Sequence, residues 1–183
     1  MKSPSSPAQR LRELFAEKKC WMLAELAQAL HYAPVSTRRL LARTGYFRSF
    51  THNGKWYTLA GVPEFNSESI WHHQNIGFSA KGSLTQTLVH LVERSACGLS
   101  AAQLNQKLRH PCHPVLSVMH KDGKLDRIKF AGEFRYLSIQ LRLNRRQRER
   151  TALEKPNSTR RRGRVSKPLN ARAAVFLLVE HVK

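Results

Sequence analysis

The stretch MLAELAQALHYAPVSTRRLLARTG, residues 22–45, decides the fold. In its first half, apolar residues recur at helical spacing and predict one buried helix face: Leu23, Leu26, Ala27 and Leu30. The segment HYAP ends this helix, because the residue before a proline is disfavoured in the helical conformation. A second helix is expected to begin near Val35 or Ser36 and to end at Gly45, a residue suited to the position after a helix.

The second predicted helix has a short apolar inner arc and a basic outer arc. At about 100° per residue, Leu40 and Leu41 mark the buried side, with Thr37 and Thr44 beside them. The remaining positions point outward or lie on the flank: Ser36, Arg38, Arg39, Ala42 and Arg43. Such a helix is shaped to enter the major groove of DNA. A solvated surface helix is the alternative interpretation.

A β-hairpin is predicted directly after these helices, with strands at residues 46–50 and 55–59. Both strands are rich in aromatic residues, and Asn53-Gly54 between them is a strong signal for a two-residue turn. An earlier helix is expected from Gln9 to Lys19, with Pro7 in its first turn. The chain therefore begins with three helices and a hairpin.

This order of elements resembles the winged helix-turn-helix superfamily. Its DNA-binding members insert the third helix into the major groove and lay the hairpin, or wing, on the backbone or minor groove. The resemblance implies that Arg38, Arg39 and Arg43 read the groove. It also implies that three residues lie at the tip of the wing: His52, Asn53 and Lys55.

The composition of the 183-residue chain favours a nucleic-acid partner. The net charge of +20 indicates a polyanionic partner or strong self-repulsion, and nucleic acid is the favoured polyanion. The basic residues do not line one face of a long amphipathic helix, as membrane binding would require. The start of the chain, MKSPSSPAQR, lacks the apolar region of a signal peptide, and no run of residues reaches membrane-spanning length. Three widely spaced cysteines form no disulfide framework. We expect a cytoplasmic, nucleoid-associated protein, or a nuclear one in a eukaryote.

The pattern then repeats. Ser83 with Gln86, and Ser100 with Gln103, are capping boxes that each start a helix. An offset of 78 relates several positions of the two halves: Leu26 to Leu104, Leu30 to Leu108, Leu40 and Leu41 to Val118 and Met119, and Gly45 to Gly123. Strands are expected at residues 125–131 and 134–139, with Gly132-Glu133 at the turn. The sequence predicts a tandem repeat of one unit.

The second unit is less basic at the equivalent helix. The same offset places Leu116, Ser117 and Lys121 where the first unit has its three arginines. Ser117 and Lys121 are candidate DNA contacts, and this helix touches the DNA backbone or packs against protein. A second copy of the chain or another protein is therefore a candidate partner of the second unit.

No metal, cofactor or catalytic site is expected. His72 and His73 are adjacent, so their side chains point apart. The cluster HPCHP at residues 110–114, with Cys97 far away, lacks the paired ligand spacings that zinc uses. The chain has no P-loop, G-x-S-x-G or H-E-x-x-H motif, and a metal-dependent nuclease would have to draw on few carboxylates, such as Asp122, Asp126 and Glu133. We expect a protein that is not an enzyme.

The end of the chain is strongly basic. Residues 142–172 carry 12 lysines and arginines against two glutamates, a net charge of +10 and half that of the whole chain. Pro156, Asn157, Ser158 and Gly163 favour an extended arm. Within it, one cluster is expected to contact phosphates or the minor groove: Arg160, Arg161, Arg162 and Arg164. A nuclear-localisation tract is the other interpretation of residues 160–162.

The sequence thus predicts a mainly α fold with small β-hairpin wings, an α+β class built as two tandem winged helix-turn-helix units. The expected divisions are a disordered lead (1–6), a first unit (7–62), a connector (63–82), a second unit (83–140), a basic linker or arm (141–168) and an apolar C-terminal helix (169–183) that docks on protein or forms a dimer. The expected function is sequence-specific binding of double-stranded DNA, in transcriptional regulation or as the DNA-recognition part of a mobile-element or recombination system. An RNA-binding or ribonucleoprotein-assembly protein is the alternative.

Overall fold

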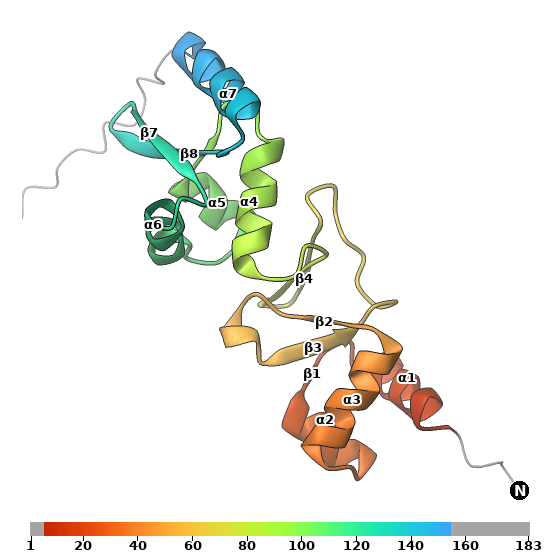
Figure 1. Cartoon of the computed structure of the whole chain (residues 1–183). Helices are drawn as coiled ribbons and strands as arrows, with labels where there is room; N and C mark the ends of the chain where they lie inside the picture. The colour runs from red at the N-terminus through yellow and green to blue at the C-terminus, as the bar shows by residue number, and fades with distance from the viewer. Residues whose placement is uncertain (1–5, 155–183) are drawn as a thin grey trace, which may run out of the picture.

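The structure is a computed structural model that describes residues 6–154. This part of the chain is mixed α/β, with helices α1 to α7 and three small antiparallel sheets, which confirms the predicted α+β class. Two lobes are joined by a hairpin (Figure 1). Among residues 6–154, no helix is both long and apolar enough to span a bilayer. The apolar helix predicted at 169–183 lies outside the described residues.

The first unit contains three helices and a three-stranded sheet of order β1-β3-β2. Its elements are α1 (Pro7–Glu17), β1 (Trp21–Met22), α2 (Leu23–Leu30), α3 (Pro34–Thr44), β2 (Tyr46–Arg48) and β3 (Trp56–Leu59). One apolar core joins all three helices to β3: Leu11, Phe15, Leu26, Leu30, Leu41, Tyr57 and Leu59. The three predicted helices are present.

The ends of these helices follow from local chemistry. The hydroxyl of Ser6 accepts a hydrogen bond from the backbone N–H of Gln9 and caps α1, so Ser6 is not part of a disordered lead as predicted. His31 takes the left-handed conformation (φ 56°) and ends α2. Gly45 follows α3 with φ 86°, as its predicted role after the helix requires, although its ψ of 128° is extended rather than helical.

The predicted two-residue turn at Asn53-Gly54 is wrong. The strands β2 and β3 pair only as far as Arg48 and Tyr57, and a longer loop containing the short 3-10 helix η1 (His52–Gly54) joins them. Tertiary contacts outweigh the local turn signal here. Phe50 is buried in the hydrophobic cluster of the second unit, and the Thr51 hydroxyl accepts a hydrogen bond of 3.0 Å from the N–H of Gly77.

The predicted connector contains a two-stranded hairpin that packs between the units. It consists of β4 (Ile70–His73) and β5 (Ile76–Ser79). Phe50 donates its backbone N–H to the carbonyl of Gly77, so the loop of the first unit is attached to β5. On the other side, a ring nitrogen of His72 lies 3.1 Å from the carbonyl oxygen of Leu108 in the second unit. The connector is therefore a structured bridge.

The second unit has the same order of elements as the first. They are α4 (Leu84–Arg94), β6 (Leu99–Ser100), α5 (Ala101–Leu108), α6 (His113–Lys121), β7 (Asp126–Phe130) and β8 (Glu133–Leu137), and the sheet order is again outer-central-outer, β6-β8-β7. Both predicted capping boxes are confirmed, with Ser83 and Gln86 at α4 and Ser100 and Gln103 at α5. The turn of its hairpin is Ala131-Gly132, one residue before the predicted Gly132-Glu133, because Phe130 pairs with Glu133. Both turn residues have the positive φ that a two-residue hairpin turn favours.

A seventh helix follows the second hairpin. Helix α7 (Leu141–Leu153) lies beside the end of α4 and the hairpin β7–β8, far from the first unit (Figure 1). An extended arm beginning at residue 141 is therefore wrong for residues 141–153. The buried residues of α7 are the polar Gln147 and Thr151, so polar contacts rather than an apolar face hold the helix in place.

Candidate nucleic-acid interface

The outer face of α3 carries the predicted groove-reading residues. Thr37 and Leu41 are fully buried, while Leu40 and Thr44 are partly buried. The residues named as candidate contacts are all exposed: Ser36, Arg38, Arg39 and Arg43. The helix is anchored through α2 and α1, which leaves its arginine side open to solvent.

This face is basic, and its arginines form no ion pair within the described residues. Among residues 6–154, no carboxylate pairs with Arg38, Arg39 or Arg43. The hydroxyls of Thr37 and Thr44 donate to the carbonyls four residues earlier in the helix, so they serve the helix itself. What remains for a ligand is a set of guanidinium donors, which suit phosphates and the guanine edge.

The loop between β2 and β3 carries the other first-unit candidates. His52, Asn53 and Lys55 are exposed, and His52 and Asn53 both have positive φ. The guanidinium of Arg48 donates to the carbonyl of Gly54 and tightens the loop. The connector hairpin, rather than α3, sets the position of this loop through its contacts with Thr51. The candidates thus form two groups, one on α3 and one on the loop.

Helix α6 presents a different surface from α3. The offset of 78 aligns Leu116 with Arg38 and Val118 with Leu40. In the structure Leu116 is fully buried, and Val118 is 55% exposed. Both pairings are wrong, because the inner residues of α3 are four positions apart and those of α6, Leu116 and Met119, are three apart. The Ser117 hydroxyl donates to the carbonyl of His113, which leaves Lys121 as the exposed candidate donor.

The histidine and cysteine clusters have structural roles in the described part of the chain. Cys112 is fully buried, its N–H donates to the Asn105 side chain over 2.7 Å, and burial raises the pKa of its thiol to about 11. His73 stacks on Trp71. Among residues 6–154, no three histidine, cysteine or acidic side chains gather as a metal site would require.

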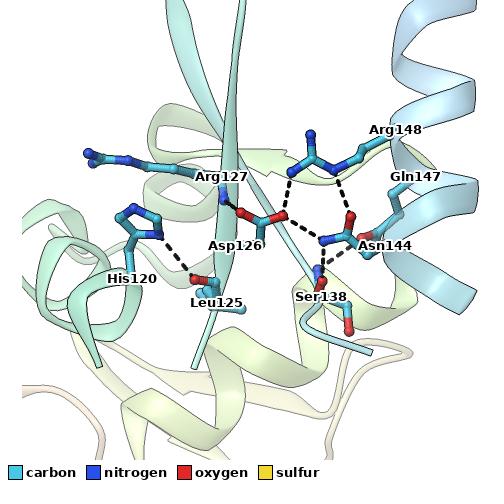
Figure 2. Close-up of polar contacts among 8 residues, drawn as sticks. All are labelled: His120, Leu125, Asp126, Arg127, Ser138, Asn144, Gln147 and Arg148. Carbon is cyan, nitrogen blue, oxygen red and sulfur yellow. Dashed lines mark hydrogen bonds and ion pairs between the residues drawn. The ribbon is translucent and has the colours of Figure 1, made fainter. Parts of the chain in front are cut away.

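Sequence reasoning missed the contacts that hold α7. Figure 2 shows the carboxylate of Asp126, on β7, accepting hydrogen bonds from the backbone N–H of Arg127 and from the side chains of Asn144 and Arg148. Burial acts to raise the pKa of Asp126, but these hydrogen bonds outweigh it and lower the pKa below its usual value. Asn144 also donates to the Ser138 carbonyl over 2.7 Å. The carboxylate thus binds α7 to the hairpin of the second unit.

The polar spacing of α7 is the sequence feature that could have revealed this helix. Asn144, Gln147 and Thr151 recur at intervals of three and four residues, as buried helical residues do. Apolar periodicity alone does not predict this helix, and the arginines between these positions favour an extended arm. The candidate cluster Arg160, Arg161, Arg162 and Arg164 lies outside the described residues.

No protein-family model matches this chain, and no curated protein is significantly similar to it. Conclusions about function therefore depend on the geometry and charge of these surfaces.

Proposed function

We propose that this chain is a sequence-specific double-stranded DNA-binding protein made of two tandem winged helix-turn-helix units. In this proposal α3 enters the major groove, and Arg38, Arg39 and Arg43 contact base edges or the phosphates that flank them. In the same proposal Ser36, which is exposed in the first turn of the helix, contacts a phosphate. The loop with His52, Asn53 and Lys55 lies on the DNA backbone as the wing.

The observation that carries the proposal is the exposed arginine face of α3. A major groove about 12 Å wide admits an α-helix, and arginine is the residue that most often makes specific contacts with guanine. In α3 the arginines are exposed above the fully buried Thr37 and Leu41, and no described carboxylate neutralises them. A helix that only faced solvent would gain little from three unpaired arginines and no acidic residue.

The rest of the chain supplies affinity that does not depend on sequence. The net charge of +20 favours binding to any polyanion, and the arginines at 160–164 add phosphate or minor-groove contacts. Helix α6, with Lys121 as its main donor, contacts the backbone or a protein partner. The proposal contains no catalytic step and no cofactor.

Selection from random DNA duplexes, followed by titration of the preferred site, tests the proposal. We expect a defined consensus, and we expect Arg38→Ala to weaken binding to that consensus by about 1–3 kcal/mol and binding to random DNA by much less. Lys121→Ala removes one positive charge from α6, the equivalent helix of the second unit, and serves as the control, which should matter less. Loss of site preference in the control but not in Arg38→Ala would reverse the roles of the two units.

The same titration with structured RNA of equal length separates DNA from RNA as the ligand. Tighter binding to the RNA, with no consensus from the duplex selection, would favour the ribonucleoprotein alternative and overturn the proposal. For a DNA-binding protein, the position of the selected sites separates the two biological settings. Promoter-proximal sites would indicate transcriptional regulation, and sites at the ends of a mobile element would indicate recombination.

A further inference from the structure

Three arginines from two helices surround one hollow in the second unit. Arg94 lies in the last turn of α4, and Arg146 and Arg150 lie one turn apart on α7. Together with Ser95 and Ala96 they line a hollow of about 210 Å³. A water molecule occupies about 30 Å³ of liquid, so the hollow has room for a hydrated phosphate group.

The charges of these arginines are not used within the described part of the chain. All three are exposed, and none pairs with a carboxylate of residues 6–154. Glu93 also lines the hollow, and its carboxylate accepts a hydrogen bond of 2.8 Å from the side chain of Gln140. Three cations therefore face one acidic group.

The arginines of α7 are divided between two faces. Arg145 pairs with Glu149, and Arg148 pairs with Asp126, so these two serve the helix and its attachment. Arg142, Arg146 and Arg150 recur every four residues and form an exposed row. Only this row meets Arg94 across the hollow, through Arg146 and Arg150.

Capping of α4 does not account for the cluster. The carbonyls at the end of this helix would attract arginine side chains if they lacked partners. Instead, the Gln147 side chain donates to the carbonyls of Val92 and Ser95, over 2.7 and 3.0 Å, and the Ser95 hydroxyl also donates to Val92. The carbonyls of Val92 and Ser95 are satisfied without these arginines, whose guanidinium groups remain available for a ligand.

We propose that Arg94, Arg146 and Arg150 form a binding site for a backbone phosphate of DNA, so that α7 rather than α6 provides the main DNA contact of the second unit. This inference rests on the proposed function. Guanidinium groups suit a phosphate because they donate parallel hydrogen bonds to its oxygens. The polar contacts that hold α7 position the helix backbone that carries two of the three arginines. Such a site raises the affinity for every DNA sequence and does not discriminate between sequences.

The test compares two double variants of the full chain that remove the same net charge. R146Q/R150Q removes the two charges of the row that line the hollow. R145Q/K124Q removes two cations that already pair with carboxylates, Glu149 and Asp122. Affinity for the selected duplex is measured over a range of salt concentrations. If each arginine neutralises one phosphate, R146Q/R150Q lowers the slope of log affinity against log salt by about 1.8, which is about 60-fold weaker binding at 0.1 M salt.

We expect the slope of R145Q/K124Q to stay close to that of the unaltered chain, and R146K/R150K to restore most of the lost slope. Unfolding curves of all variants should coincide, because the substituted side chains are exposed. Equal slopes for the two glutamine variants, or an unchanged slope in R146Q/R150Q, would overturn the inference. R38Q/R39Q in the same assay separates the two proposals. A loss of site preference there, with no effect of R146Q/R150Q, would leave the proposed function intact and remove the phosphate site.

Discussion

Replacing Gln147 with alanine should detach α7 at a defined cost in stability. The side chain is fully buried, its oxygen accepts the Ser138 N–H over 2.9 Å, and its nitrogen donates to Val92 and Ser95. In Gln147→Ala the N–H of Ser138, which is also buried, loses its partner at a cost of about 1–3 kcal/mol. The Val92 carbonyl still accepts hydrogen bonds from the N–H and the hydroxyl of Ser95, so its loss of the Gln147 bond adds little to the cost in stability. With about 1 kcal/mol for the space left behind, the expected loss is about 2–4 kcal/mol.

Urea unfolding followed by far-ultraviolet circular dichroism measures this loss. Limited trypsin digestion locates it, because the arginines of α7 become substrates when the helix detaches. Arg145→Ala is the control, since that side chain is exposed and bound only to Glu149. A change below about 0.5 kcal/mol in Gln147→Ala, with unchanged cleavage, would refute the role given to this side chain.

Gln147→Glu adds a dependence on pH with a defined sign. The new carboxyl keeps an acceptor for Ser138 but faces the carbonyls of Val92 and Ser95, so burial and these oxygens favour its protonated form and raise its pKa. When a group has a higher pKa in the folded protein than in the unfolded chain, its contribution to stability is complete below the unfolded pKa, which is about 4.3 for glutamate. That stability is lost as the pH rises through the folded pKa. A stability difference from the unaltered chain that does not grow between pH 4 and pH 7 would contradict this reasoning.

Three further outcomes are expected. Arg43→Ala should weaken binding to the selected duplex by about 1–3 kcal/mol, measured by titration, and an equal loss on random duplexes would show that the residue reads no base. The lowered pKa of Asp126 implies a stabilisation that is present above the unfolded value of about 3.9 and is lost as the pH falls through the folded pKa, so acid unfolding of Asp126→Asn should lack this component. In the native protein, iodoacetamide should modify the partly exposed Cys97 first, as mass spectrometry would show. Burial raises the pKa of Cys20 to about 12 and that of Cys112 to about 11. Early modification of either buried thiol would contradict the packing.

The helices of both units could be predicted because local chemistry determines them. The serines of the two capping boxes accept hydrogen bonds from the N–H groups of Gln86 and Gln103, at the predicted positions. The inner and outer faces of α3 follow from residue spacing alone, since Leu41 is fully buried and the arginines are exposed. Such features depend on neighbours within four residues.

The hairpin of the first unit could not be predicted in detail, because distant residues decide it. Asn53-Gly54 has the composition of a tight turn. The chain instead forms a longer loop, in which Phe50 packs against Gly77. The hydroxyl of Thr51 accepts a hydrogen bond from the N–H of Gly77. A single sequence contains no indication that residues 50 and 77 meet, so the local signal predicts the wrong turn.

Phe50 has a consequence for how the chain folds. It belongs by sequence to the first unit, but the residue is only 7% exposed and lies in the cluster that contains Leu88 and Leu104 of the second unit. The boundary of the repeat is therefore not the boundary of cooperative unfolding. A fragment that begins at residue 63 would lose an aromatic ring from its core, and a fragment that ends at residue 62 would expose that ring to water. The two units therefore share a core residue and do not pack independently of each other, and the spacing between the surfaces proposed to bind DNA is set when the protein folds.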